Sequence, residues 1–366
     1  MKKIRIVSFL LCVCVVLLSF SSCAKPQVAM EYKGETISVN MYTYWTSLIK
    51  SNYISATDDN DKYWDTKYSN GQSYEQKMKE IIDFNVKTNL ICKKLFSELG
   101  LSIPESKAEQ IDLALSDLIE AYGSKSALNS ALSNYNMNYK MLKQVYEIEV
   151  MTTMVYEALY TTNGPRAITD DKLDEYFKSS YSLMDMIMIY DDYEYERDAE
   201  GKLIFDDKTN SYKTKKLSED ESKAKNDLAN DIIKRLQNGE SFETLKEQYN
   251  ENPKKDIFTD GYYISTNDVS VYGMDIVTAS QQTEIGSYKM VDDGAVICIM
   301  MRKELKEKPY IKDDYLTQFE NLVEYCKMND FNKYMTELMK NVKVLDDAIS
   351  NISVRKAPLI NDSALM

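Results

Sequence analysis

The chain has 366 residues, 44% of them hydrophobic and 28% charged, which is typical of folded proteins and long enough for two domains. It contains no histidine, which excludes histidine-based acid–base catalysis, Ser-His triads and zinc sites that use histidine. Without residues 1–22, which hold three basic residues and no acid, the 45 basic residues fall to 42 against 58 acids, a net charge of −16. Nucleic acid is therefore not an expected partner, because its phosphates are neutralised by Lys and Arg.

The first residues have the pattern of an export signal. A basic start, Lys2–Arg5, precedes the apolar run Ile6–Phe20 and then Ser21-Ser22-Cys23. This ending resembles a bacterial lipoprotein signal, which implies that residues 1–22 are removed and Cys23 is lipidated. An ordinary signal peptide or a short anchor helix is the alternative. No later apolar run is long enough to span a bilayer, so we expect an extracytoplasmic protein anchored to the bacterial cell membrane by lipid.

The mature chain begins with a predicted hairpin. Residues 28–32 alternate like a strand, Lys33-Gly34 turns the chain, and residues 35–37 return. Ser38 then caps a helix with an apolar face. Residues 54–72 are polar and are predicted to be a loop.

Three acids in that loop, Asp58, Asp59 and Asp61, raise the question of a calcium site. They lack the spacing, the glycine and the distal glutamate of an EF-hand loop, so no metal is predicted. No cofactor is predicted elsewhere. Cys92, Cys298 and Cys326 stand at wide spacings within apolar patterns, which favours buried thiols over a disulfide framework.

Three longer amphipathic helices follow. One runs from the cap Ser73-x-x-Gln76 to Gly100, one from Pro104 to Gly123, and one over residues 139–160. Their apolar stripes are more typical of a helical core than of a cofactor site. Gly164-Pro165 ends this region, which predicts a helical domain over residues 24–165.

The next region opens and closes with apolar runs, Leu183–Ile189 and Ala295–Met301, which are predicted to be buried strands. Short helices enclosed by two such strands predict a small α+β domain over residues 168–305. The elements between the strands are a helix with the capping box Ser218-x-x-Glu221, a second helix from Ser241, and the turn Gly261-Tyr262-Tyr263.

This order of elements resembles the parvulin-type peptidyl-prolyl isomerase domain. The residues that carry the resemblance are the opening strand, Asn238–Leu245, the Gly261-Tyr262-Tyr263 turn and Gly294–Ile297. In that family two histidines face each other across an apolar pocket that holds the substrate proline, and they fall at Met186 and Val296 here. The missing histidines leave it undecided whether the protein is an enzyme. The resemblance implies these pocket positions: Met186, Met188, Asn252, Tyr262, Tyr263, Val269, Met274, Asp293 and Val296.

The hairpin and aromatic-rich helix at the start resemble the chaperone domain of the PrsA and SurA foldase families. In those foldases the segment after the parvulin domain packs back on the N-terminal helices. The resemblance implies an α+β protein with a discontinuous, mainly helical chaperone domain (24–165 and 306–346) and an inserted parvulin-like domain (168–305). We expect residues 191–216 to form a projecting hairpin and residues 347–366 a loose tail.

Three functions remain open from the sequence. The first is a lipid-anchored foldase or chaperone that binds unfolded or nascent secreted polypeptides and carries a degenerate isomerase domain. The 28 Tyr and 19 Met fit adaptable binding surfaces, and they also fit plain packing. The second is an active isomerase that works by pocket shape, and the third is a solute-binding or structural envelope lipoprotein. A homodimer is left open.

Overall fold

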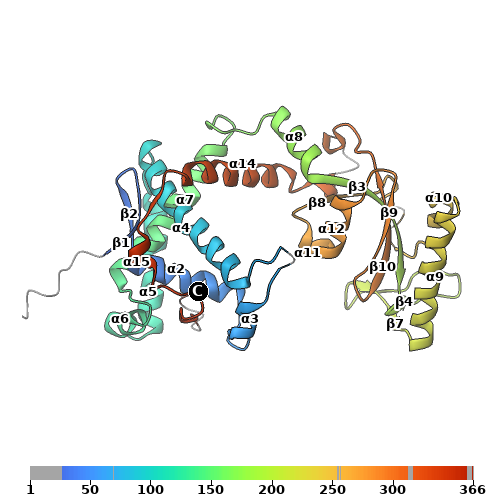
Figure 1. Ribbon diagram of the computed structural model, residues 1–366, viewed down its shortest axis with the longest axis horizontal. Helices are drawn as coiled ribbons and strands as arrows, with labels where there is room; N and C mark the ends of the chain where they lie inside the picture. Colours follow the sequence, from blue (N-terminus) through green and yellow to red (C-terminus); the bar gives the residue numbers. More distant parts are fainter. Residues whose placement is uncertain are drawn as a thin grey trace, which may run out of the picture. The chain divides into compact units, whose positions relative to one another are not determined.

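The structure is a computed structural model that describes residues 27–68, 70–253, 255, 257–311, 316–360 and 365. The chain forms two compact units (Figure 1): residues up to Ala167 together with those from Asp330, and Ile168–Asn329. The α+β class is confirmed. The predicted signal and its lipidation site, Cys23, lie outside the described residues. Within the described ranges, no helix has the length and apolar character needed to cross a membrane.

The first unit is mainly helical, with one small antiparallel sheet in the order β11-β1-β2. The predicted hairpin is confirmed, and the second chain segment of the unit adds β11, where Val344 pairs with Met30. The unit's elements are β1 (Val28–Tyr32), β2 (Glu35–Ser38), α2 (Val39–Tyr53), α3 (Asp61–Asp65), α4 (Tyr74–Glu98), α5 (Glu105–Ala121), α6 (Lys125–Ser133), α7 (Tyr139–Tyr160), β11 (Lys343–Val344) and α15 (Asp346–Ile349), with the later part of α14 (Leu322–Met339).

Capping residues fix the helix ends of this unit. The Ser38 hydroxyl accepts the Met41 N–H at the start of α2, and Ser73 forms the predicted capping box with Gln76 at the start of α4. Gly100 ends α4 with a φ of 66°, the left-handed conformation that glycine adopts without strain. The predicted loop at 54–72 is corrected in part, because Asn60 caps the short helix α3, which buries Trp64.

The described part of the expected loose tail is packed, which corrects that expectation for residues 347–360. The segment begins with α15, and Val354, Ala357 and Ile360 are buried after it. The fully buried ammonium of Lys50 on α2 donates hydrogen bonds to carbonyl oxygens of this segment. The sequence shows no hydrophobic periodicity here because the segment forms no long helix or strand. Individual side-chain and main-chain contacts hold it in place.

The second unit is built on a four-stranded antiparallel sheet in the order β8-β3-β10-β9. The two predicted apolar strands lie side by side, with Ile187 opposite Ile299 and Ile189 opposite Ile297. Helices α9 and α10 cover one face, and α11 and α12 cover the other (Figure 1). The unit contains α8 (Asp170–Ser180), β3 (Tyr181–Tyr190), β4 (Tyr193–Tyr195), β5 (Phe205–Asp206), β6 (Ser211–Tyr212), β7 (Thr214–Lys216), α9 (Glu219–Gln237), α10 (Phe242–Tyr249), β8 (Tyr262–Ser265), α11 (Val269–Tyr272), α12 (Met274–Gln282), β9 (Tyr288–Asp292), β10 (Val296–Lys303), η1 (Pro309–Ile311) and α13 (Leu316–Phe319).

The two faces of this sheet have different side chains, because successive residues of a strand point to opposite sides. Under α9 and α10 lie isoleucines of β3 and β10, and we call this side the aliphatic face. On the side of α11 and α12 lie mainly methionines with Tyr262 and Cys298, and we call this side the methionine face. The isoleucines are Ile187, Ile189, Ile297 and Ile299, and the methionines are Met184, Met186, Met188 and Met300.

The end of β3 has no neighbouring strand on the β8 side, because β8 pairs only as far as Met184. Residues after α10 take that place: Glu251 N–H donates to the Met188 carbonyl at 2.9 Å, and the Asn250 side chain accepts the Met188 N–H at 3.1 Å. The Glu251 carboxylate accepts the Tyr190 N–H at 2.9 Å. The polar main-chain groups of this strand edge are therefore satisfied without a fifth strand.

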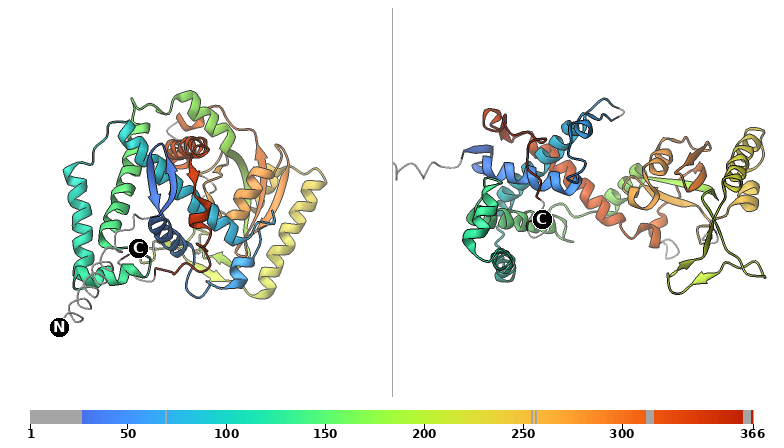
Figure 2. Two further views of the ribbon diagram at one scale, coloured as in Figure 1. Left: turned by 60° about the vertical axis from the view of Figure 1, so that its left-hand side comes forward. Right: turned by 90° about the horizontal axis from the view of Figure 1, so that it is seen from below.

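The predicted hairpin over residues 191–216 is confirmed. Strand β4 pairs with β7 and β5 pairs with β6, both antiparallel, and the hairpin extends away from the four-stranded sheet (Figure 2, right). Tyr190, Tyr195, Tyr212 and Phe205 form a series of ring contacts along it, with centroids 5.1 to 6.1 Å apart.

The expected domain boundary at residue 305 is corrected, since residues up to Asn329 belong to the second unit. Phe319, Leu322 and Cys326 are buried against Phe177 on α8 and Tyr181 at the start of β3. The apolar pattern of this region does not indicate which core its residues join. The resemblance assigned all of 306–346 to the first unit, and that is wrong for 306–329.

Candidate functional site

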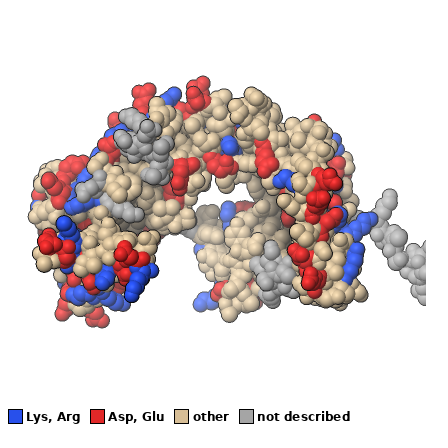
Figure 3. Space-filling view, turned by 180° about the vertical axis from the view of Figure 1, so that it is seen from behind, with Lys and Arg blue, Asp and Glu red and all other residues tan. Residues whose placement is uncertain are grey.

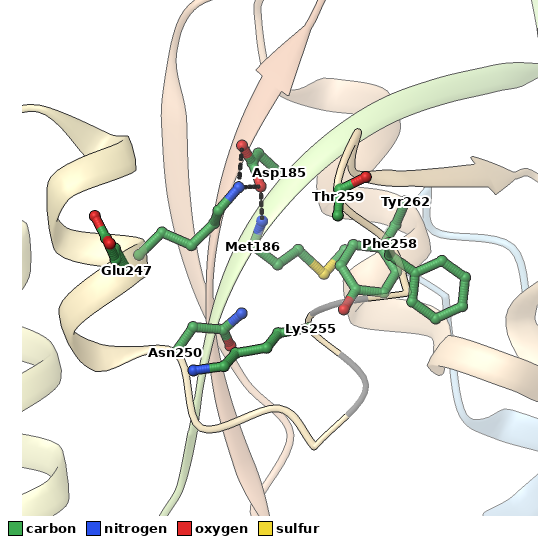
Figure 4. Close-up of a pocket in the computed structure, with 9 residues that line it drawn as sticks. Asp185, Met186, Glu247, Asn250, Lys255, Phe258, Thr259 and Tyr262 are labelled. Carbon is green, nitrogen blue, oxygen red and sulfur yellow. Dashed lines mark hydrogen bonds and ion pairs between the residues drawn. The ribbon is translucent and has the colours of Figure 1, made fainter.

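A pocket of about 400 Å³ lies beside β3, just past the last residue pair between β3 and β8. One wall is apolar and is made by Met186, Phe258 and Tyr262, and the other carries charges from α10 and β3. Figure 4 shows the Met186 side chain extended toward Phe258 and Tyr262. The full lining is Asp185, Met186, Lys246, Glu247, Asn250, Lys255, Phe258, Thr259 and Tyr262.

Asp185 holds the charged wall together. Its carboxylate is buried and accepts hydrogen bonds from the Lys246 ammonium at 2.8 and 3.0 Å and from the Lys303 ammonium at 2.9 Å. Burial raises the pKa of Asp185, but the hydrogen bonds from the two lysines outweigh it, so the pKa lies below its usual value. Asp185 is therefore ionised and engaged at neutral pH, and it is not poised to transfer a proton.

The apolar wall contains one hydroxyl, that of Tyr262. Asn252, which is buried behind the pocket, donates its side-chain N–H to this hydroxyl oxygen. Burial raises the pKa of Tyr262 to about 12, so the phenol is neutral at physiological pH. The Tyr262 and Phe258 rings lie 4.8 Å apart and form a flat apolar surface beside Met186. This wall suits an apolar side chain.

The predicted pocket positions do not all meet at this site. Met186 and Tyr262 line the pocket and Asn252 binds Tyr262, while Met188, Val269 and Val296 pack on the same methionine face. Tyr263 points to the opposite side of the sheet, where it packs on Phe177 and Phe319. Met274 is 62% exposed on α12. Asp293 is exposed in the turn before β10, where its carboxylate accepts the N–H groups of Ala295 and Val296.

The register of the sheet also separates Met186 from Val296. Met186 lies opposite Met300 and Val296 lies opposite Tyr190, so the two positions share a face but stand four residues apart along the strand pair. At the rise of an antiparallel strand this is about 13 Å. The structure therefore places these two positions along one face rather than directly across from each other.

Sequence reasoning missed the charged half of the site. Asp185 is the single acid in the apolar run Leu183–Ile189, and a charge in a buried strand requires a partner. That signal was available, but the sequence did not show that Lys246 and Lys303 would supply the partners. Phe258 was missed because it lies in an irregular segment before Gly261.

A second pocket, of about 470 Å³, lies within the first unit between the hairpin, α2, α4 and α7. Methionines from two helices, Met41, Met141 and Met151, form much of its apolar surface. Methionine side chains are flexible and polarisable, so they accommodate apolar groups of different shapes. Among the described residues, no group of three or more carboxylate and thiol side chains is arranged to hold a metal ion.

Charge is mixed over the surface. On the face drawn in Figure 3, Asp and Glu side chains lie among Lys and Arg side chains. The ion pairs of the described residues include exposed short-range ones, such as Lys223 with Asp227 and Lys340 with Glu337. Pairs of this exposed kind stabilise little.

No protein-family model matches the chain. No curated protein matches it. Solved structures similar to it include PrsA from Bacillus subtilis (17% identity, 84% of this chain and 97% of that chain, TM-score 0.23), the foldase protein PrsA from Streptococcus pneumoniae (15%, 89% and 97%, TM-score 0.25), and the peptidylprolyl isomerase PrsA from Bacillus cereus (18%, 78% and 97%, TM-score 0.28).

Proposed function

We propose that this is an exported, lipid-anchored protein that binds unfolded secreted polypeptides, and that its isomerase-like pocket holds a proline or another apolar side chain with little or no catalysis. The observation that carries the proposal is the pocket beside β3. Met186, Phe258 and Tyr262 offer an apolar wall, and Lys246 stands opposite with its ammonium. An apolar residue of an extended chain fits the first wall while a main-chain carbonyl faces the second.

The chemistry of proline isomerisation explains why such a site binds better than it catalyses. Rotation about an X–Pro bond has a barrier of roughly 18–20 kcal/mol, set by amide resonance, and an enzyme lowers it by preferring the twisted amide to the planar one. No histidine is available, Asp185 is held by two lysines, and the Tyr262 hydroxyl is engaged by Asn252. Binding the planar peptide equally well adds affinity but no rate.

The pocket of the first unit supports the same function. Its methionine-lined surface is of the adaptable kind that suits many sequences, as a protein that binds diverse unfolded chains requires.

The export and anchoring part of the proposal rests on the sequence from Lys2 to Cys23. Changing Cys23→Ala should release the protein from the membrane fraction, and continued membrane retention of that variant would refute the lipid anchor.

Peptide binding tests the pocket directly. The mature full-length protein should bind a fluorescein-labelled Ala-Ala-Pro-Ala peptide more tightly than the matched Ala-Ala-Ala-Ala peptide. Phe258→Ala removes half of the apolar wall and should weaken binding about tenfold, which corresponds to about 1.4 kcal/mol. Phe205→Ala, an exposed phenylalanine of the hairpin, is the matched control and should leave affinity unchanged.

Two activity assays then separate the candidate functions. The protein should suppress light scattering when a chemically unfolded protein is diluted from denaturant, and a proline-peptide assay should give a rate close to that in buffer. A rate well above buffer that falls in Phe258→Ala would instead favour an isomerase that works by pocket shape. Neither suppression nor peptide binding in the wild-type protein would overturn the proposal.

A further inference from the structure

The C-terminal segment Ser353–Ile360 is bound within the first unit much as a peptide is bound by a receptor. Val354, Ala357 and Ile360 are 5%, 7% and 2% exposed. The segment makes one turn, closed by a hydrogen bond from Ala357 N–H to the Ser353 carbonyl at 2.9 Å, and then continues without regular structure to Ile360.

We call the side chains that hold this segment the groove, and two of them bind its main-chain atoms. The Lys50 ammonium on α2 donates to the carbonyl oxygens of Arg355 at 2.9 Å and Ala357 at 2.8 Å. The neighbouring Ser51 hydroxyl accepts the Ile360 N–H at 2.8 Å. Every polypeptide has such carbonyl and N–H groups, so these contacts do not depend on the sequence that occupies the groove.

One side chain of the segment is bound specifically. The Arg355 guanidinium contacts three carboxylates: its Nε donates to Glu75 at 2.7 Å, and its Nη atoms contact Asp61 and Asp65. The Asp61 and Asp65 side chains are 90% and 68% exposed, so water screens these two ion pairs and weakens them. The Arg355 contacts therefore favour an arginine at this position, but they are weak enough for the segment to dissociate.

The groove does not need its occupant to remain charge-balanced. The Lys50 ammonium also forms an ion pair with Asp59 at 2.8 Å and lies 5.4 Å from the centre of the Trp64 ring. Both partners belong to the same part of the unit as Lys50. If the segment leaves, water replaces the two carbonyl oxygens, and Lys50 keeps its counter-charge.

We propose that this groove, built around Lys50, Ser51 and the three carboxylates, is a polypeptide-binding site and that Ser353–Ile360 is its built-in competitor. Its external ligand is a stretch that forms the same single turn, with an arginine followed by apolar residues two and five positions later, as Ala357 and Ile360 follow Arg355. This rests on the proposed binding of unfolded chains and adds a second site, a ligand class and a means of control. The segment occupies the groove until a better ligand is present.

The test uses the full-length mature protein and a fluorescein-labelled peptide with the sequence of residues 350–360. Arg355→Glu repels the three carboxylates, releases the segment and leaves the groove unchanged. Because the apparent Kd equals the intrinsic Kd divided by the fraction of vacant groove, this variant should bind the peptide at least about tenfold more tightly than the wild type. Lys356→Glu makes the same charge change at the next residue and should behave as the wild type.

Two further variants make the test decisive. Adding Lys50→Met to Arg355→Glu should abolish peptide binding, and a peptide carrying Glu in place of its arginine should not bind the Arg355→Glu protein. Circular dichroism measures whether each variant is folded. Equal affinity of wild type and folded Arg355→Glu for the peptide, or no binding to either, would overturn the proposal.

A failure of the Arg355→Glu variant to fold also has a defined interpretation. If Arg355→Glu is unfolded, Ile360→Asp serves as the releasing change, because it leaves the carboxylates and Arg355 in place. Loss of folding in both variants would show that the segment is a fixed part of the core, and the proposal would be wrong. The peptide readout is independent of Phe258, so failure here leaves the proposed function of the second unit standing, and the reverse also holds.

Discussion

The two faces of the sheet in the second unit are both largely buried but chemically unlike. The aliphatic face is filled by β-branched isoleucines, which have few rotamers and pack in one way. The methionine face is filled by flexible side chains, with Tyr262 and Asn252 forming a polar contact beside the pocket. The aliphatic face therefore makes the unit rigid, and the methionine face provides an adaptable surface. Substitutions on the aliphatic face should mainly lower stability, and those on the methionine face should mainly alter peptide binding.

The largest effect is expected on the aliphatic face. Ile187 is fully buried, and Ile187→Ala should destabilise the second unit by about 4 kcal/mol because the rigid surroundings cannot close the cavity. Met300→Ala, on an equally buried methionine of the methionine face, should cost about 2 kcal/mol because its flexible neighbours partly fill the cavity. Urea unfolding followed by circular dichroism measures both. Equal losses would show that the two faces do not differ in rigidity.

The next effect concerns Asp185, where the charged wall of the pocket meets the sheet. Asp185→Asn removes the buried carboxylate that Lys246 and Lys303 share, leaves them the exposed Glu243, and should cost about 3 kcal/mol at pH 7. The folded-state pKa of Asp185 is lowered, so its contribution to stability is present above the unfolded pKa of about 3.9 and is lost as pH falls through the lower folded value.

The pH dependence of stability provides a control for the Asp185→Asn prediction. The gap in stability between wild type and Asp185→Asn should be constant from about pH 5 to neutrality and should close in stronger acid. Asp227→Asn, which breaks an exposed pair with Lys223, should change stability by less than about 0.5 kcal/mol at any of these pH values. A gap that persists in strong acid would mean that the carboxylate's charge is not what stabilises the fold.

A smaller effect on stability should accompany a clear effect on binding. Met186→Leu conserves volume and should cost less than about 1.5 kcal/mol. It should nevertheless weaken binding of the proline peptide a few-fold, because the flexible thioether beside Phe258 and Tyr262 is lost. Ile187→Leu is the matched change on the aliphatic face and should leave peptide affinity unchanged. If both substitutions alter affinity alike, the binding role of the methionine face is wrong.

The smallest effect is expected at Met274, which the sequence had placed in the pocket. Its side chain is 62% exposed on α12, so Met274→Ala should change stability by less than about 0.5 kcal/mol and should not alter peptide binding. Fluorescence anisotropy and urea unfolding check this together. A loss of affinity comparable to that of Phe258→Ala would place Met274 at the binding site after all.

Local signals were enough to predict much of the fold. The capping residues Ser38, Ser73 and Ser218 mark helix starts because each side chain acts on N–H groups within three residues of itself. The apolar runs of β3 and β10 predicted buried strands, and the structure pairs these strands antiparallel. The alternation of a strand also shows why Tyr262 and Tyr263 were not both able to line one pocket.

Long-range contacts account for what the sequence did not show. Lys303 reaches Asp185 across 118 residues of chain, and Lys50 binds a segment more than 300 residues away. Neither partner is marked by spacing or periodicity. Phe319 was expected in the first unit but belongs to the second, for the same reason: an amphipathic helix does not identify the core that it joins.

The covered edge of β3 has a consequence for the proposed binding of unfolded polypeptides. An open strand edge is a template on which foreign β-strands add, and this is how aggregates begin to grow. Here Asn250 and Glu251 occupy the positions that an incoming strand would need on Met188 and Tyr190. A polypeptide bound as proposed would then find no open edge on this part of β3, and its binding would depend on reversible side-chain contacts.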